Sequence, residues 1–138
     1  MLIHDVLRLS AQRRPGDTAL IWKDEPQSFA ALYERAQRCA GWIASLAPAG
    51  SRIAILSANR PEVVEACYGV PLAGSILVLL NYRLNAAELA QAVSDASAQV
   101  LLYDAGLAEL AESVDSPTLE RRIALDAGPD SAYERGLA

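Results

Sequence analysis

Three mainly apolar runs lie in the middle of the chain, at residues 52–56, 76–80 and 99–103. Their first residues lie 24 and 23 positions apart, and each gap holds one amphipathic helix pattern. A strand covered on both faces has no polar alternation, and a strand–helix–strand rhythm favours parallel strands with right-handed crossovers. The pattern predicts an α/β fold with a layered, mostly parallel βαβαβ sheet flanked by helices. It also predicts that 76–80 is an inner strand of this sheet.

Helices and a hairpin are expected around these strands. Apolar residues three or four positions apart predict helices at 3–13, 29–46, 59–74 and 85–96, and a weaker one at 105–114. Residues 18–22 and 27–29, with a turn at 23–26 between them, predict a short N-terminal β-hairpin. Residues 121–126 are a candidate fourth strand, whereas 127–138 show no clear period.

Capping residues fix several of the expected helix ends. Ser28 is a candidate N-cap, and Asn85 with Glu88 fits a capping box. The helix at 59–74 has two alternative starts: Asn59 and Glu62 as a capping box, or Arg60 as the N-cap with Pro61 at the first helical position. Gly74 is expected to end that helix.

Composition narrows the class of protein. The 138 residues suit one globular domain, with 52% apolar and 21% charged residues, and the net charge of −5 disfavours nucleic acid as a partner. The charge is uneven: residues 1–60 carry eight basic and five acidic residues, and 61–138 carry four and twelve. No secretory h-region and no transmembrane-length apolar run is present. We expect a cytoplasmic protein, at most peripheral to a membrane.

Cysteine and histidine usage argues against a metal site and for a reducing compartment. The two cysteines, Cys39 and Cys67, lie on apolar helix faces, and His4 is the sole histidine. Two separated cysteines and one histidine do not match the ligand spacing of zinc sites. Both cysteines are therefore expected to be small residues of the core.

Few residues suggest chemistry. The sequence has no GxGxxG, no GxxxxGK[ST] and no GxSxG motif. The acidic residues Glu62, Glu65 and Glu88 are explained by helix starts or exposed helix faces. No catalytic, cofactor-binding or metal-binding residue is assigned.

The carboxyl ends of the parallel strands offer the best candidate site, because open α/β sheets bind ligands there. Asn59, Asn81 and Arg83 follow two of the strands and are predicted to form a substrate-side rim. Structural roles remain open alternatives: Asn59 as a helix cap, Asn81 as a strand end and Arg83 as a solvated charge.

Several segments together resemble the N-terminal part of the adenylate-forming enzymes, the superfamily of acyl-CoA synthetases, adenylation domains and luciferases. These are "RRPGDTALIW", "SFAALYERAQRCAGWIASL" and "GSRIAILSANRPEVVEACYGVPLAGSILVLLNYRLNAAEL", and the match runs from about residue 5 to about residue 110. The "NYRL" segment is most similar to fatty-acid and medium-chain CoA ligases. Ser51 and Leu79 depart from the usual Asp and Pro, and both look structural.

The resemblance implies a parent enzyme that uses ATP and Mg²⁺ to convert a carboxylic acid, expected to be a fatty acid, into an acyl-adenylate and then transfers the acyl group to CoA. Residues 1–138 would be an N-terminal subdomain fragment of the adenylation domain, without the phosphate loop and the C-terminal domain. This segment alone is expected to bind no cofactor and to be inactive. Its expected partners are the acid, the remainder of its own polypeptide and, through exposed apolar surface, further copies of itself.

Two other interpretations remain. The segment could belong to another adenylate-forming enzyme, such as a peptide-synthetase or aryl-acid adenylation domain. It could also be a stand-alone, non-enzymatic α/β interaction module.

Overall fold

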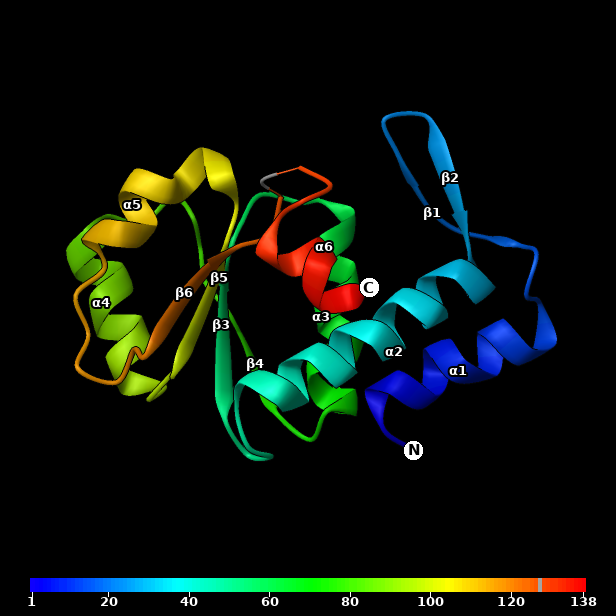
Figure 1. Cartoon of the computed structure of the whole chain (residues 1–138), viewed down its shortest axis with the longest axis horizontal. Helices are drawn as coiled ribbons and strands as arrows, with labels where there is room; N and C mark the ends of the chain where they lie inside the picture. Colours follow the sequence, from blue (N-terminus) through cyan, green and yellow to red (C-terminus); the bar gives the residue numbers. More distant parts are fainter. Residues whose placement is uncertain (127) are drawn as a thin grey trace.

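The computed structural model describes residues 1–126 and 128–138 and shows a sheet between layers of helices (Figure 1). A two-stranded hairpin, β1–β2, stands apart from a four-stranded sheet of order β4-β3-β5-β6. In chain order the elements are α1 (Ile3–Arg13), β1 (Thr18–Trp22), β2 (Glu25–Ser28), α2 (Phe29–Leu46), β3 (Arg52–Leu56), α3 (Pro61–Leu72), β4 (Ile76–Leu79), α4 (Ala86–Asp95), β5 (Val100–Tyr103), the 3-10 turn η1 (Ala105–Leu107), α5 (Ala108–Ser113), β6 (Arg121–Ala124) and α6 (Ala132–Leu137).

The four-stranded sheet is parallel throughout, as predicted. Ile53 of β3 is in register with Leu77 of β4 on one side and Val100 of β5 on the other, and β6 extends the sheet beyond β5. The predicted strands at 52–56, 76–80 and 99–103 and the candidate fourth strand are therefore confirmed, within one or two residues at their ends. Because the strands are parallel, the segments that follow β3, β4, β5 and β6 all leave the same edge of the sheet.

Helices cover both faces of the sheet and bury separate apolar clusters. On one face α2, α3 and α6 pack over Ile53 and Ile55, and on the other α4 and α5 pack over Ala54 and Leu56 (Figure 1). Alternate residues of a strand point to opposite faces, so one apolar strand serves both clusters. Helix α1 packs on α2 and α3, around Leu7. None of the described helices is long and apolar enough to cross a membrane.

Strand β4 corrects one prediction, because it is an edge strand rather than an inner one. The side chains of Ile76 and Leu79 are 48% and 61% exposed. An apolar run indicates that a strand has apolar surroundings, but it does not give the strand order. Here the chain returns from α4 to the far side of β3, so β5 takes the inner position and β4 is left at the edge.

The hairpin and the C-terminal region differ from the sequence-based expectation. The hairpin turn is the pair Lys23–Asp24, both with positive φ (48° and 66°), so β2 starts at Glu25 and includes Pro26. A proline is tolerated in such a strand because the hairpin has only edges. The sequence of residues 127–138 shows no clear period and predicted no element there, whereas residues 132–137 form α6; Ala127 lies outside the described residues. The Oγ of Ser131 caps α6 by accepting the Glu134 backbone N–H at 3.0 Å.

The helix caps decide the open alternative for α3. Arg60 is the N-cap residue and Pro61 the first helical residue, so the capping box of Asn59 and Glu62 is wrong. The predicted caps Ser28, Asn85 and Glu88 are confirmed by hydrogen bonds. Gly74, at φ +76°, follows the last turn of α3 in the left-handed conformation that glycine adopts without strain.

Candidate functional site

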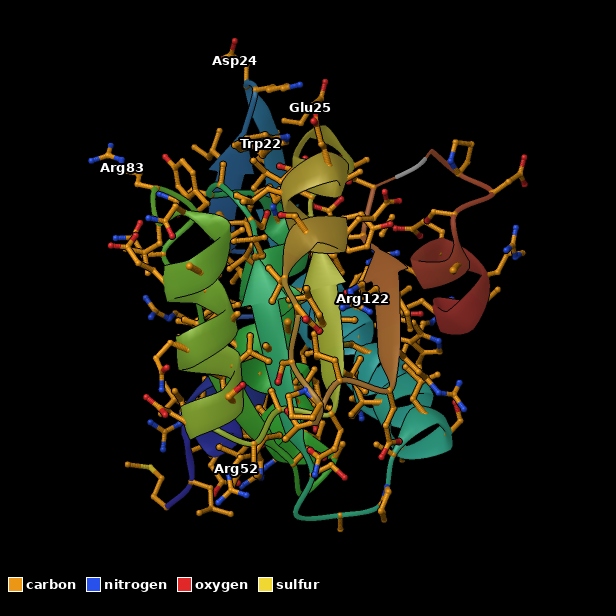
Figure 2. The ribbon with its side chains drawn as sticks, turned by 90° about the vertical axis from the view of Figure 1, so that its left-hand side faces the viewer. Trp22, Asp24, Glu25, Arg52, Arg83 and Arg122 are labelled. Carbon is orange, nitrogen blue, oxygen red and sulfur yellow. The ribbon has the colours of Figure 1, made fainter. Side chains whose placement is uncertain are left out.

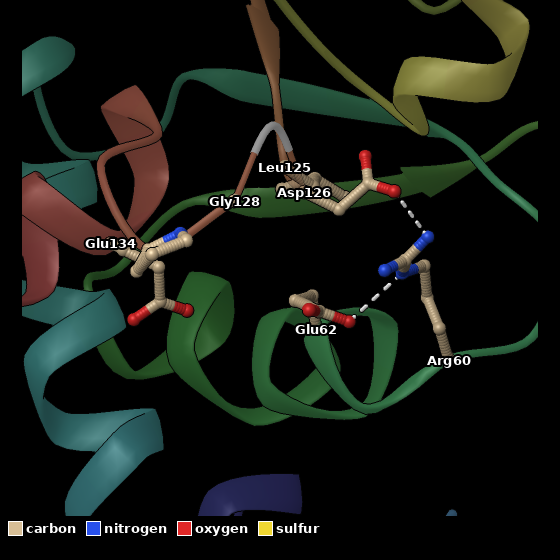
Figure 3. Close-up of a pocket in the computed structure, with 7 residues that line it drawn as sticks. Arg60, Glu62, Leu125, Asp126, Gly128 and Glu134 are labelled. Carbon is tan, nitrogen blue, oxygen red and sulfur yellow. Dashed lines mark hydrogen bonds and ion pairs between the residues drawn. The ribbon is translucent and has the colours of Figure 1, made fainter. Parts of the chain in front are cut away.

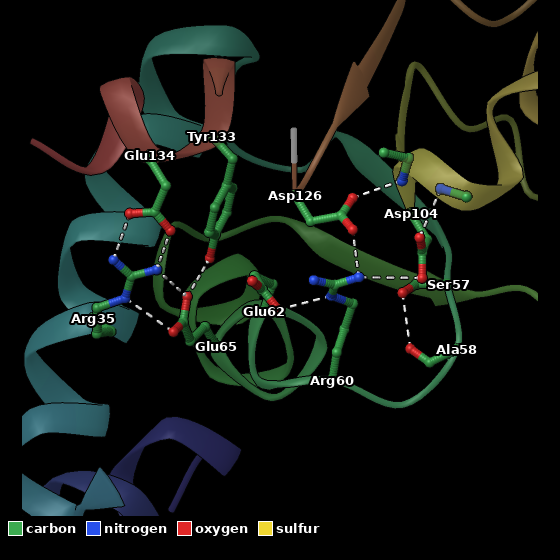
Figure 4. Close-up of polar contacts among 12 residues, drawn as sticks. Arg35, Ser57, Ala58, Arg60, Glu62, Glu65, Asp104, Asp126, Tyr133 and Glu134 are labelled. Carbon is green, nitrogen blue, oxygen red and sulfur yellow. Dashed lines mark hydrogen bonds and ion pairs between the residues drawn. The ribbon is translucent and has the colours of Figure 1, made fainter. Parts of the chain in front are cut away.

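Four charged residues gather where β3, β5 and β6 end, and we call them the strand-end cluster: Arg60, Glu62, Asp104 and Asp126 (Figure 4). Arg60 follows β3, Asp104 follows β5 and Asp126 follows β6. The parallel topology therefore brings together residues that are 44 and 66 positions apart in the sequence.

Arg60 is the centre of this cluster. Its Nε donates to Glu62 Oε2 at 2.9 Å, and its Nη1 donates to Asp104 Oδ2 at 3.3 Å and to Asp126 Oδ2. Burial by itself lowers the pKa of Arg60, but the hydrogen bond to Glu62 and the charges of Glu62, Asp126 and Asp104 more than offset it, so the pKa is raised. Arg60 thus remains charged and is already engaged with three carboxylates.

Both aspartates also hold the loop after β5. Asp104 Oδ1 accepts the backbone N–H of Gly106 at 2.9 Å, and Asp126 Oδ1 accepts that of Ala105 at 2.6 Å. Each carboxylate therefore uses one oxygen for the loop and the other for Arg60. This arrangement fixes the strand ends relative to one another and to the start of α3.

A pocket of about 360 Å³ opens beside the cluster (Figure 3). Its lining residues are Arg60, Glu62, Leu125, Asp126, Gly128, Pro129 and Glu134. Three carboxylates and one guanidinium make this lining acidic, and the guanidinium is already paired. None of the described side chains that line the pocket offers unpaired positive charge to offset the phosphates of ATP.

The described residues do not fit a metal cofactor either. Among them, no group of three or more His, Cys, Asp or Glu side chains is placed to hold a metal ion. The carboxylates of the strand-end cluster are directed at Arg60 and backbone N–H groups instead. No step of nucleotide or metal chemistry is therefore assigned to these side chains.

A second polar network joins α2, α3 and α6 and consists of Arg35, Glu65, Tyr133 and Glu134 (Figure 4). Arg35 forms paired hydrogen bonds to both carboxylates, at 2.9 and 3.0 Å to Glu65 and at 2.7 and 2.8 Å to Glu134. Tyr133 OH donates to Glu65 Oε2 at 2.6 Å. We call this group the α6 network, because it attaches α6 to the two helices beneath it.

Burial and hydrogen bonding shift the pKa values of several side chains in and beside the α6 network. Hydrogen bonds from Arg35 lower the pKa of Glu134, while those to Glu134 raise the pKa of Arg35. Burial raises the pKa of the Tyr133 hydroxyl, which therefore remains a donor. Burial also raises the pKa of Cys39 to about 12. Because the thiolate is the nucleophile, Cys39 is unsuited to covalent catalysis near neutral pH.

The predicted rim residues lie apart from these networks. Asn59 is exposed in the loop before α3. Asn81 Oδ1 accepts the backbone N–H of Arg83 at 3.0 Å, and the Arg83 guanidinium lies 5.9 Å from the centre of the Tyr82 ring. Figure 2 shows Arg83 extending away from the molecule. Among the described residues, no hydrogen bond or ion pair joins Asn59 to Asn81 or Arg83, and their role as a substrate-side rim stays a prediction.

Sequence reasoning missed the residues that do meet. Arg60 was considered only as a helix cap, and Glu65, assigned to a helix start or an exposed face, is 2% exposed. A signal for part of the strand-end cluster was present, because aspartates directly follow the apolar residues of two predicted strands, "VLLY" and "IAL". The carboxyl ends of parallel strands share one edge, which predicts that Asp104 and Asp126 lie close together.

Comparisons with known proteins agree with this architecture. A family model described as AMP-binding enzyme matches residues 7–137. The long-chain-fatty-acid–CoA ligase of Thermus thermophilus is 33% identical over 116 residues, which are 80% of this chain and 21% of that protein.

Two solved structures share the fold. A Rhodopseudomonas palustris protein described as a long-chain-fatty-acid CoA ligase superimposes with a TM-score of 0.88 and 28% identity, over 100% of this chain and 36% of that chain. The o-succinylbenzoate coenzyme A synthetase of Bacillus subtilis, in complex with ATP and magnesium, gives a TM-score of 0.77 and 31% identity over 87% of this chain and 32% of that chain.

These matches share one feature: the chain spans between 21% and 36% of the relatives. The family match nevertheless extends over nearly every residue of this chain. The α/β fold with its parallel sheet and hairpin is the one these relatives have. The chain belongs to the AMP-binding enzyme family.

Proposed function

We propose that residues 1–138 are the N-terminal scaffold segment of an acyl-CoA ligase, an enzyme that uses ATP and Mg²⁺ to join a carboxylic acid to CoA. The observation that carries this proposal is the match of residues 7–137 to the AMP-binding enzyme family, together with 33% identity to a fatty-acid–CoA ligase. The chain corresponds to about a fifth of that relative, so the activity belongs to a longer polypeptide.

Within that enzyme the segment supplies structure rather than chemistry. Its pocket at the strand ends is acidic, and the guanidinium that lines it is engaged with three carboxylates. An anionic carboxylate and the ATP phosphates require offsetting positive charge and backbone donors. We place the binding of ATP, Mg²⁺ and CoA in the polypeptide that follows this segment. Asn59, Asn81 and Arg83 stay candidates for a rim on the acid-binding side.

The test is acid-dependent exchange between ATP and pyrophosphate. The full reading frame that contains this chain is expected to show exchange and to form acyl-CoA, whereas the purified 138-residue chain shows neither. Exchange by the 138-residue chain would contradict the scaffold role. A stop codon directly after Ala138 would contradict the ligase and favour a stand-alone interaction module.

A fatty acid is the proposed substrate. The Thermus thermophilus relative is named for long-chain fatty acids, while the Bacillus subtilis relative is named for o-succinylbenzoate. A panel of fatty acids of increasing length, o-succinylbenzoate and amino acids separates these classes by kcat/KM. A preference for an amino acid, or for an aromatic acid without formation of the CoA thioester, would favour another adenylate-forming enzyme.

The cellular location and partners follow from the same proposal. We place the enzyme in the cytoplasm, at most peripheral to a membrane, with the rest of the polypeptide as the partner of this segment. The isolated chain then has uncovered apolar surface and associates with itself. Light scattering at increasing protein concentration measures this, and a constant monomer mass would contradict it. Fractionation of cells tests the location.

A further inference from the structure

The free edge of the parallel sheet carries exposed apolar side chains. Ile76 and Leu79 of β4 are 48% and 61% exposed, and Tyr82, just after the strand, is 39% exposed. We call these three residues the β4 face. Leu79 lies on the side of the sheet covered by α3, because its register partner is Ile55, and Ile76 lies on the opposite side. The strand is therefore incompletely covered on both faces.

The opposite edge of the same sheet is different. Strand β6 begins with Arg121 and Arg122, both exposed, and Arg122 donates to the carbonyl oxygens of Ala111 and Val114 near the end of α5 (Figure 2). Charged residues on an edge strand prevent pairing with another strand. Strand β4 has no charged residue, no proline and no bulge. One edge of the sheet is thus protected from pairing and the other is suited to it.

The sequence around β4 extends this contrast. Residues 66–82, from α3 through β4, form 17 positions without a charged side chain. Helix α3 carries only Glu62 and Glu65 as charged residues, and all of its residues are buried or partly buried. A helix that is apolar nearly all round is typical of a buried position between other elements. Helix α3 and β4 together therefore have the composition of interior elements.

We propose that the polypeptide following Ala138 in the longer enzyme covers the β4 face and adds a strand to the free edge of β4. This inference rests on the proposed function, which places the chain at the start of a longer protein. The relatives support an occupant from the same chain, because they are about three to five times as long as the matched segment. A four-residue edge buries far less than the roughly 1,000 Å² that a specific complex needs, which disfavours a second copy. A segment of the same polypeptide has a high effective concentration and needs less area.

Hydrogen exchange tests this directly. Peptides that cover residues 75–80 are compared in the 138-residue chain and in the full-length protein. Pairing at the free edge protects outward N–H groups, so exchange is expected to slow by about ten-fold or more in the full-length protein. Equal exchange in the two proteins would overturn the proposal. So would protection of these peptides in the full-length protein that falls as that protein is diluted, because that indicates a second copy rather than a segment of the same chain.

A pair of variants supplies the control. Leu79→Lys places a charge on the β4 face, and Ile21→Lys places one on the hairpin, where Ile21 is 66% exposed. In the full-length protein Leu79→Lys is expected to lower Tm and speed exchange in β4, while Ile21→Lys does neither. In the 138-residue chain both variants are expected to keep the wild-type circular dichroism, which shows that folding of the segment survives. Equal, small effects in the full-length protein would overturn the proposal.

The ligase function and the covered edge of β4 can be contradicted independently of each other. A full-length protein that lacks acid-dependent ATP–pyrophosphate exchange, but protects β4, contradicts the ligase and supports the covered edge. A full-length protein that is active, but leaves β4 as open as in the 138-residue chain, supports the ligase and overturns the covered edge.

Discussion

At the scale of single residues, the most constrained side chain is Tyr133. It is fully buried, its ring meets that of Trp42 edge-on with centroids 5.2 Å apart, and its hydroxyl donates to Glu65. When a buried carboxylate loses a hydrogen-bond donor, the free-energy cost of removing it from water is no longer fully offset. Glu65 therefore depends on both Arg35 and Tyr133, and the short helix α6 depends on Glu65.

Removing the Tyr133 hydroxyl measures this dependence. Tyr133→Phe keeps the ring and its contact with Trp42 but deletes the donor to Glu65. We expect the free energy of unfolding in urea to fall by about 1.5–3 kcal/mol, the range for a hydrogen bond to a charged group. Tyr82→Phe, at a 39% exposed position, is the control and should change little. An unchanged midpoint for Tyr133→Phe would show that Arg35 alone satisfies Glu65.

Acid is expected to weaken the attachment of α6. The pKa of Glu134 is lowered from its usual 4.5, chiefly by the hydrogen bonds that Arg35 donates. A carboxylate with a lowered folded-state pKa stabilises the protein fully above its unfolded-state pKa, and this contribution disappears as the pH falls through the lowered value. Glu134→Gln should therefore destabilise the chain at pH 7 and have a smaller effect at pH 3.

The measurement is the difference in free energy of unfolding between wild type and variant at each pH. Glu112→Gln, on an exposed part of α5, removes the same charge away from Arg35 and serves as the control. A difference for Glu134→Gln that stays constant between pH 7 and pH 3 would contradict the assignment.

At the scale of elements, helices and strands with a regular apolar period were predicted well, and the short helix α6 was not. Strand β5 and helices α2 and α4 have strong apolar patterns. The two helices also begin at cap residues that the sequence shows, Ser28 and Asn85. Helix α6 has six residues, and two of them, Tyr133 and Glu134, point at partners on α2 and α3. Such a helix is held by contacts with distant residues rather than by its own pattern, so local reasoning has little to detect.

Two glycines in helices test how closely α2 and α3 pack. A Cβ added at Gly69 of α3 would lie 2.7 Å from the Cβ of Cys39 and 2.9 Å from the carbonyl oxygen of Ala36, both on α2. Gly69→Ala should destabilise the chain by about 1–3 kcal/mol through overpacking. Gly41→Ala in α2 meets no atom within 4 Å and should stabilise it by about 0.5–1 kcal/mol, because alanine favours the helix. Thermal unfolding of both variants gives the signs, and a Gly69→Ala variant as stable as wild type or more stable would contradict the close approach.

At the scale of the whole molecule, the class of fold followed from the spacing of three apolar runs, but the site did not. The partners of Arg60 come from the ends of β5 and β6, and their meeting depends on strand order. Strand order is set by long-range packing, which the period of a segment does not encode. The same limit explains why β4 was expected inside the sheet.

Cooperativity is the property to measure at this scale. Trp42 lies in the cluster beneath α6, while Trp22 is 37% exposed on the hairpin. In Trp22→Phe the remaining indole reports on packing among α2, α6 and the sheet. We expect its fluorescence and the far-UV circular dichroism to change at the same urea concentration, as in a two-state domain. An earlier fluorescence change would mean that α6 detaches before the sheet unfolds.

The ion pair between Arg35 and Glu134 joins residues 99 positions apart. At 5–20 residues per second, a ribosome takes roughly 5 to 20 s to reach Glu134 after it has added Arg35. Through this interval the nascent chain already holds Arg35 and Trp42 but still lacks the helix that covers them. The interior beneath α6 is thus completed only after residues 132–137 have been made, and until then its apolar surface is open to aggregation or to chaperone binding.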